Sequence, residues 1–223
     1  MATAVAMWSM GVLAVAPAAA QPKELPATVV TRAGPAETFI KGSPAWTPAN
    51  LRAQVNEGDG VRTLPGGRLA VRTASGQVLR LAQLTQIFFL APDGQAGDRP
   101  VLVKMDSGWL WVAVMPGSPP RSQIEVRAGP ASVTVRGTGA GIRLNRDGSV
   151  LIRVFHGEAL CAGPDAERRW ERVLKEGWEL LVLAAGAPAE PRRLTREEQD
   201  EEWLRWNEEQ DLAGEYGGKP PKR

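Results

Sequence analysis

Residues 55–183 repeat one short pattern, in which apolar and polar side chains alternate and a turn interrupts the alternation about every eight to twelve residues. Alternation with a period of two is typical of strands that bury one face. Turns at this spacing are typical of antiparallel sandwiches and barrels. The sequence therefore predicts an all-β fold, an antiparallel two-layer sandwich or β-roll of many short strands. In this pattern Arg68, Arg72 and Arg80 are expected to face water.

The limits of the pattern divide the chain of 223 residues, which is long enough for one sizeable domain with additions. We expect a single β domain at residues 55–189. Residues 21–54 hold several prolines and show little periodicity, which predicts an N-terminal arm with one or two strands. Residues 213–223 combine glycine, proline and basic residues, which predicts a disordered basic tail.

Residues 195–212 predict one acidic α-helix. Thr195 and Glu198 have the spacing of a capping box, in which a hydroxyl and a carboxylate satisfy the free backbone N–H groups at a helix start. Trp203 and Trp206 are three residues apart and therefore share one helical face. Because so acidic a helix is not stable alone in water, we favour docking of both rings onto the β domain over a helix that binds a partner.

The N-terminal segment has the composition of a secretory signal peptide. No residue from Ala2 to Ala20 is charged, and small residues precede Gln21. We expect residues 1–20 to be cleaved, which places the mature protein in the periplasm or outside a bacterial cell without a stable membrane span. The alternative is an uncleaved membrane anchor, for which the alanine-rich composition is poorly suited. No Lys or Arg precedes the apolar run, which leaves a start further upstream open.

Composition gives little support for catalysis, cofactors or nucleic acid. The formal net charge is +2, too small to indicate a nucleic-acid partner. His156 and Cys161 are the single histidine and cysteine, so a catalytic triad has one available base and no disulfide forms within the chain. Asp93, Asp98 and Asp106 are interpreted as solvated acids of turns, because their spacing lacks that of a calcium loop. We expect a non-enzymatic protein without metal or cofactor.

A glycine-rich stretch, VRGTGAGI, follows the strand pattern at 133–135 and precedes that at 142–144. A phosphate-binding loop would need a helix after the glycines, and a nucleophile elbow would need a serine and a helix. A hairpin follows instead, with Asp147-Gly148 as its turn signal. We therefore interpret Gly137, Thr138 and Gly139 as a structural turn motif, a bulge or bend that exploits the conformational freedom of glycine.

Trp109 and Trp111 are two residues apart and share one face of a predicted strand. If that face is exposed, the rings form an aromatic platform for a sugar or a partner protein. If it is covered, they belong to the core. Leu110 and Val112 make the other face apolar as well, which favours the core. Trp109, Trp111, Trp203 and Trp206 are the candidate interaction residues.

Several segments together resemble the FecR domain of exported bacterial proteins. Residues 55–87 are similar to the family's opening strands, and residues 122–161 are similar to its core. Gly137–Thr138 correspond there to a Gly-Thr pair. Residues 174–182 resemble the closing segment, and residues 201–211 resemble a tryptophan-rich helix that often follows the domain. The resemblance covers about 130 residues and depends on the order of the segments.

The resemblance implies an all-β fold outside the cytoplasm with no catalytic residues. Well-known members relay iron-siderophore signals from an outer-membrane transporter to a sigma factor. Those regulators carry a cytoplasmic helical segment before a membrane span, whereas this chain begins with its apolar segment. We therefore identify the chain with a stand-alone member without the anti-sigma segment.

These observations favour an exported, non-catalytic domain that binds or scaffolds cell-envelope components, with a role in envelope signalling. The partner is expected to be an envelope protein. The alternative is a module that binds envelope polysaccharide or peptidoglycan, with Trp109 and Trp111 as its stacking platform. A periplasmic regulator of iron-siderophore sigma-factor signalling and a secreted hydrolase are less favoured.

Overall fold

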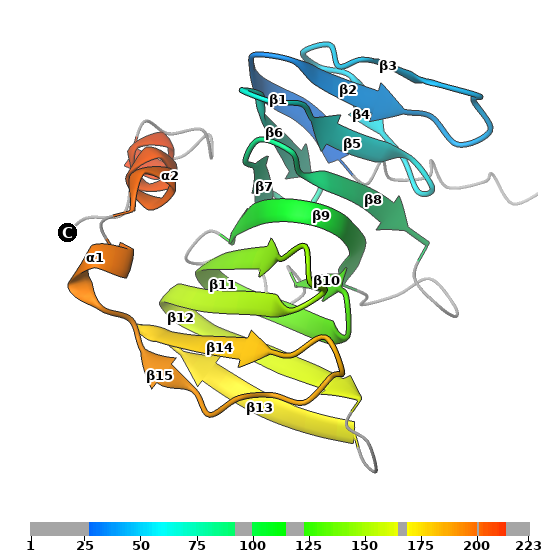
Figure 1. The fold of residues 1–223 in the computed structure, drawn as a ribbon. Helices are drawn as coiled ribbons and strands as arrows, with labels where there is room; N and C mark the ends of the chain where they lie inside the picture. Colours follow the sequence, from blue (N-terminus) through cyan, green and yellow to red (C-terminus); the bar gives the residue numbers. More distant parts are fainter. Residues whose placement is uncertain (1–26, 92–99, 115–122, 165–168, 200, 213–223) are drawn as a thin grey trace, which may run out of the picture.

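The computed structural model describes residues 27–91, 100–114, 123–164, 169–199 and 201–212 (Figure 1). The predicted signal peptide and basic tail lie outside these residues. No helix within the described ranges is long and apolar enough to cross a membrane.

The described residues form one sheet of 15 strands and two short helices. The strands are β1 (Ala27–Ala33), β2 (Ala36–Phe39), β3 (Trp46–Pro48), β4 (Gln54–Val55), β5 (Gly60–Thr63), β6 (Arg68–Thr73), β7 (Val78–Leu81), β8 (Gln86–Leu90), β9 (Val101–Ala113), β10 (Ile124–Ala128), β11 (Ala131–Leu144), β12 (Val150–Pro164), β13 (Arg169–Lys175), β14 (Trp178–Val182) and β15 (Arg192–Arg193). The helices are α1 (Arg196–Gln199) and α2 (Glu202–Leu212).

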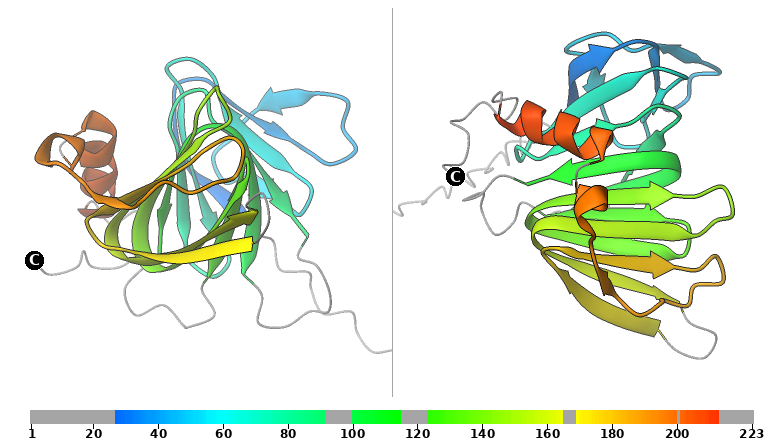
Figure 2. Two further views of the ribbon diagram at one scale, coloured as in Figure 1. Left: turned by 60° about the horizontal axis from the view of Figure 1, so that its bottom comes forward. Right: turned by 60° about the vertical axis from the view of Figure 1, so that its left-hand side comes forward.

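The prediction of a mostly β fold is confirmed, and β9–β10 is the one parallel pair among the described strands. The strands are hydrogen-bonded into a single continuous sheet rather than two separate ones. A buried apolar cluster extends from β1 to β14, so the sheet curls around one core (Figures 1 and 2). One curled sheet therefore encloses the core, whereas we expected two packed layers to enclose it.

Two long strands bend where a glycine permits it. The apolar runs at 101–104 and 109–114 are typical of two separate strands, but β9 is continuous and turns at Gly108, whose φ is 92°. β12 bends likewise at Gly157, whose φ is 73°. β8 and β7 then pair with successive halves of β9, and β13 and β14 pair with successive halves of β12. The bends let each long strand contribute to two parts of the curled sheet.

The N-terminal part of the sheet curls until its two ends meet. Its strands are hydrogen-bonded in the order β2-β5-β8-β9-β7-β6-β1, and the terminal strands β1 and β2 are consecutive in the chain. Only Gly34 and Pro35 separate them. The predicted arm at 21–54 is thus an integral part of the sheet, with three complete strands.

The predicted helix is interrupted. The capping box forms, because Thr195 N–H donates to Glu198 Oε2 at 2.8 Å and Glu198 N–H donates to Thr195 Oγ1 at 3.3 Å. The helix that it begins, α1, ends at Gln199, and α2 starts at Glu202. Figure 2 shows both helices on one side of the sheet.

The position of α2 corrects one expectation about the arginines. Arg80 on β7 is completely buried, whereas we expected it to face water. Its strand does alternate, but α2 covers the outward face, and Arg80 NH1 lies 3.5 Å from the backbone oxygen of Asn207. Alternation shows which residues share a face but not what covers that face.

Candidate functional site: a groove between the sheet and the C-terminal helix

Trp109 and Trp111 lie under the C-terminal helix. Trp111 is 0% exposed and stacks on Phe155, with ring centroids 5.1 Å apart. Trp109 is half-buried, and its ring centroid lies 6.0 Å from that of Trp203. The stacking-platform alternative therefore does not hold for Trp111. Trp111 is instead a buried packing residue, as the core alternative predicted, and the C-terminal helix covers it.

Trp203 and Trp206 attach α2 to the sheet, which is the docked arrangement that the sequence favoured. Trp203 is 6% exposed, and its ring stacks on that of Trp206 with centroids 5.1 Å apart. Arg68 of β6 lies 5.0 Å above the Trp206 ring and pairs with Glu202 at 3.2 Å. Aromatic stacking, a cation–π contact and an ion pair thus act together at the start of α2.

An ion network attaches α1 next to this aromatic contact. Arg153 of β12 pairs with Glu179 of β14 at 2.8 Å, with Glu198 at 3.5 Å and with Glu201 at 2.9 Å. Arg192 contacts both Glu179 and Glu198. Hydrogen bonding from Arg192, assisted by the Thr195 N–H, lowers the pKa of Glu198 to about 2. The carboxylate is therefore ionised at neutral pH, and the network ties the helices to the sheet.

Two glycines of the stretch VRGTGAGI make room for the tryptophans. A Cβ on Gly139 would lie 3.2 Å from Trp111, and a Cβ on Gly141 would lie 3.2 Å from Nε1 of Trp109. The register of β11 against β12 does shift around Gly139, as a bulge requires. Neither glycine has a positive φ, however. The expected reason, backbone freedom, is therefore wrong for Gly139, where close packing is the cause.

The predicted motif lies within one strand and not between two. Gly137 and Thr138 belong to β11, between the pairs Arg136↔Glu158 and Gly139↔His156. Two residues of β11 thus oppose the single Gly157 of β12, which is the count of a β-bulge.

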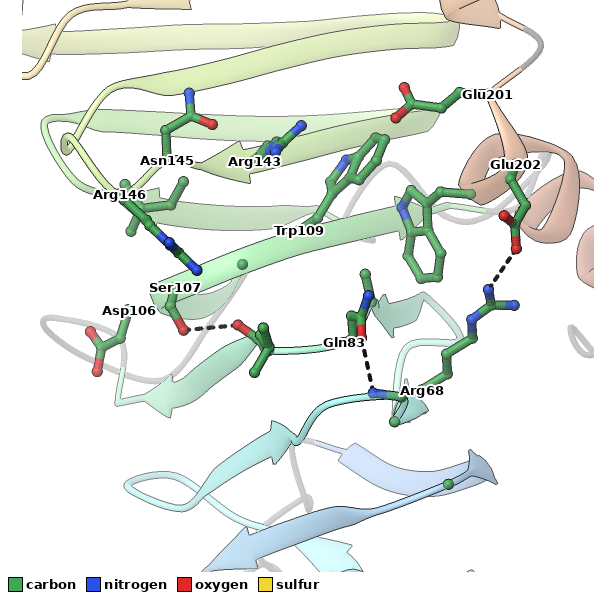
Figure 3. A pocket seen from close by; sticks show the side chains of 18 of the residues that line it. Arg68, Gln83, Asp106, Ser107, Trp109, Arg143, Asn145, Arg146, Glu201 and Glu202 are labelled. Carbon is green, nitrogen blue, oxygen red and sulfur yellow. Dashed lines mark hydrogen bonds and ion pairs between the residues drawn. The ribbon is translucent and has the colours of Figure 1, made fainter.

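A groove of about 1560 Å³ opens beside these rings (Figure 3). The turns β1–β2, β5–β6, β7–β8, β10–β11 and β11–β12 line it, together with the middle of β9 and the start of α2. In Figure 3, Arg143 lies beside the Trp109 ring, Arg146 lies farther to the left and Arg68 lies below. The groove joins turns that are far apart in the sequence, a common arrangement for binding surfaces.

The β7–β8 turn presents an exposed leucine to the groove. Leu84 is 49% exposed and has a φ of 60°, which costs free energy for a residue with a Cβ. Its carbonyl oxygen accepts a hydrogen bond of 3.2 Å from Ser107 Oγ. Next to it, Thr85 Oγ1 accepts a bond of 2.9 Å from Trp109 N–H. A Cβ on Gly108 would lie 2.4 Å from the Cα of Thr85, so this glycine permits the close approach that holds the turn.

Sequence reasoning missed these groove residues. The turn at Leu84 contains no glycine or proline, and the position of Arg143 beside Trp109 depends on pairing between distant strands. Because no turn was predicted there, nothing in the local sequence pointed to Leu84.

The residues that could carry chemistry are dispersed. His156 is exposed on β12, whereas Cys161 is 0% exposed and burial raises the pKa of its thiol to about 12. Asp106 lies in the groove and pairs with Lys104 at 2.9 Å. Asp93 and Asp98 lie outside the described residues. No group of metal-ligating side chains occurs in the described part of the chain.

Comparisons with known proteins give a family match and a likeness to solved structures. Residues 59–160 match the family model described as FecR protein. Two crystal structures of a candidate anti-sigma factor from Parabacteroides distasonis are similar, with 20% sequence identity and a TM-score of 0.49. The match covers 60% of this chain and 59% of the other, so it spans less than two thirds of that protein. No curated protein sequence matches.

Proposed function

Residues 59–160 of this chain form a FecR domain, as the sequence resemblance predicted. On this basis we propose that the chain is an exported, non-catalytic binding protein of the bacterial cell envelope. It takes part in envelope signalling by binding a segment of another envelope protein in the groove between the sheet and α2. The observation that carries this proposal is the groove itself, in which several turns present side chains around Trp109.

The shape and the lining of the groove support a protein segment as the ligand. Partner-binding sites combine an aromatic anchor with polar residues at the rim. Trp109 supplies the aromatic surface, Leu84 adds an exposed apolar side chain, and arginines stand around them. The sheet and its turns position these residues around the groove.

Export follows from the N-terminal segment. Residues 1–20 have the uncharged, alanine-rich composition and the small residues before the cleavage point that signal peptidases recognise. A mature protein that begins at Gln21 would retain every described strand. The periplasm, or the medium outside the cell, is the proposed location.

The proposal of a non-catalytic protein is supported by the positions of Cys161 and His156, the two side chains best suited to nucleophilic or acid–base chemistry. Cys161 is buried with a raised pKa, so its thiol stays protonated at neutral pH. His156 lies on β12 and is not among the residues that line the groove.

Binding of envelope glycan is the second candidate. Trp109 is half-buried, so part of its ring could contact a sugar. Two contacts already engage that ring, since Trp203 lies beside it and Arg143 lies 5.6 Å above it. The pair of rings that the glycan hypothesis relied on is not exposed, which makes a protein segment the better candidate.

A groove-filling substitution tests the proposal. Gly66 lines the groove, has a φ of 73° and has no neighbour within 4 Å of a Cβ, so Gly66→Asn adds a side chain without a clash. Asparagine tolerates a positive φ. Gly76→Asn is the matched control, because Gly76 is equally open, with a φ of 91°, in a turn outside the groove.

Tagged full-length protein is cross-linked in cells of its bacterial source, purified from the periplasmic and membrane fractions, and its partner is identified by mass spectrometry. We expect one envelope protein to be captured by the unsubstituted chain and by Gly76→Asn, and to be lost with Gly66→Asn. Equal capture by Gly66→Asn would overturn the groove as the site. Recovery of the uncleaved chain from the cytosol would overturn export. A siderophore transporter as the captured protein would favour the narrower role in iron signalling.

A further inference from the structure

The charges in the groove do not cancel locally. Each of its acidic side chains has a basic partner: Asp106 pairs with Lys104 at 2.9 Å, Glu201 with Arg153 at 2.9 Å and Glu202 with Arg68 at 3.2 Å. These carboxylates are therefore neutralised. Two of their three partners, Lys104 and Arg153, do not line the groove. Of the arginines that do line it, Arg68 is therefore the one that pairs with these acids.

Two arginines of the groove keep their charge. Arg143 is exposed and contacts the face of Trp109 at 5.6 Å, and Arg146 is exposed in the β11–β12 turn. Neither forms an ion pair with a described carboxylate. The adjacent acid, Asp147, accepts hydrogen bonds from the backbone and the hydroxyl of Ser149 instead. The side of the groove that β11 forms is therefore positive.

An apolar contact point faces the same groove. Leu84 is 49% exposed in a turn with a φ of 60°, and hydrogen bonds to Ser107 and Trp109 hold that turn in its strained form. Strain of this kind persists where the surroundings enforce it, and it is common at ligand-binding sites. Arg143 and Arg146 thus offer guanidinium groups without an ion pair to a described carboxylate, and Trp109 and Leu84 add an aromatic and an exposed aliphatic surface.

We propose that the groove between the sheet and α2 binds an acidic peptide segment that also carries an apolar side chain. This inference rests on the proposed function and names the class of its partner. The carboxylates of the segment pair with Arg143 and Arg146, and its apolar side chain packs on Leu84. An anionic polysaccharide would satisfy the arginines but has no aliphatic group for Leu84, which is why a peptide is the better fit.

Binding of a defined probe tests the inference. The probe is a short fluorescein-labelled peptide in which glutamate and leucine alternate, and its affinity for the full chain is measured by fluorescence anisotropy. We expect Arg143→Gln and Arg146→Gln each to weaken binding about fivefold, since an exposed ion pair contributes up to about 1 kcal/mol. Higher salt is expected to weaken binding as well.

Two variants separate loss of contact from loss of fold. Leu84→Asn removes the apolar contact but suits the positive φ, so weaker binding by this variant does not arise from unfolding. Arg169→Gln removes an exposed arginine on β13, outside the groove, and is expected to bind the probe like the unsubstituted chain.

The comparison probes decide the outcome. Equal binding of a peptide with glutamine in place of glutamate would overturn the anionic class. Binding of oligogalacturonate without binding of the acidic peptide would overturn the peptide class. In either case, a cross-linked envelope partner that is lost with Gly66→Asn would leave the proposed function standing. Retention of that partner by Gly66→Asn would instead remove the proposed function, whatever the probe does.

Discussion

The ε nitrogen of Arg153 lies 2.8 Å from Oε2 of Glu179, and both residues are at least nine-tenths buried. This pair connects β12 to β14 and reaches Glu198 and Glu201 of the helical region. A buried guanidinium thereby joins the sheet to the segment that covers it. Removal of either member would leave the other charged and with only its more exposed partners.

Arg153→Met is expected to lower the free energy of unfolding by about 2 kcal/mol, because the buried Glu179 carboxylate loses one of its two guanidinium partners and keeps only the more exposed Arg192. Urea denaturation followed by tryptophan fluorescence measures the change. The double variant Arg153→Met/Glu179→Leu should recover part of the loss. Arg127→Gln, at an exposed pair with Glu125, is the control and should change stability by less than about 0.5 kcal/mol. A loss as small as the control's would show that the buried network does not stabilise the fold.

Acid should weaken the attachment of the helices through Glu198. Its pKa is lowered to about 2 from 4.5 by hydrogen bonds from Arg192 and Thr195. Its contribution to stability is therefore complete above pH 4.5 and is lost as the pH falls from 4.5 toward 2. The urea concentration at the midpoint of unfolding should fall more steeply with decreasing pH for the unsubstituted chain than for Glu198→Gln. Parallel curves would contradict the assignment.

The two glycines under the tryptophans should differ in their tolerance of a methyl group. Gly139→Ala is expected to destabilise by about 1–3 kcal/mol, because Trp111 is buried against Phe155 and cannot move away. Gly141→Ala meets the half-buried Trp109, which can shift, so its effect should stay within about 0.5 kcal/mol of zero. Thermal unfolding of both variants provides the measurement, and equal effects would be the contrary result.

Trp203→Ala should release α2 while leaving the sheet folded. Trp203 packs in a small cluster with Trp111 and Ala113, apart from the main core of the sheet. Limited proteolysis is expected to cut near residues 201–206 much faster in this variant, and circular dichroism should retain the β signal. Arg205→Gln, at an exposed position of α2, is the matched control. Resistance equal to that of the control would mean that the ring does not hold the helix.

Leu84→Asn is expected to raise the free energy of unfolding by about 1 kcal/mol, because asparagine adopts a positive φ at a lower cost than leucine. Chemical denaturation tests this directly. Leu90→Asn, on β8 and without a positive φ, should destabilise instead. If Leu84→Asn is less stable than the unsubstituted chain, the turn is not strained.

Local sequence patterns predicted many single features correctly. Asp147-Gly148 forms the β11–β12 turn, where Gly148 has a φ of 83°. Thr195 and Glu198 form the capping box. These features depend on residues close together in the chain, so the information needed to predict them is local.

The candidate site could not be predicted in the same way. Trp109 and Trp111 were recognised as a pair, but their cover comes from Trp203, more than 90 residues later. Arg80 appeared to face water for the same reason. Leu84 was not predicted as a candidate site residue, because its backbone conformation is imposed by contacts with β9.

The amino-acid sequence by itself determined the mostly β class, the positions of several turns and the cap of the helix, since side-chain alternation and turn chemistry act over a few residues. The tertiary structure alone decided that β9, β11 and β12 run unbroken through their bends, that glycine on β11 gives space to indole rings, and that α2 covers Arg80. The reason is that strand pairing and burial depend on residues far apart in the chain, whose contacts no local pattern records.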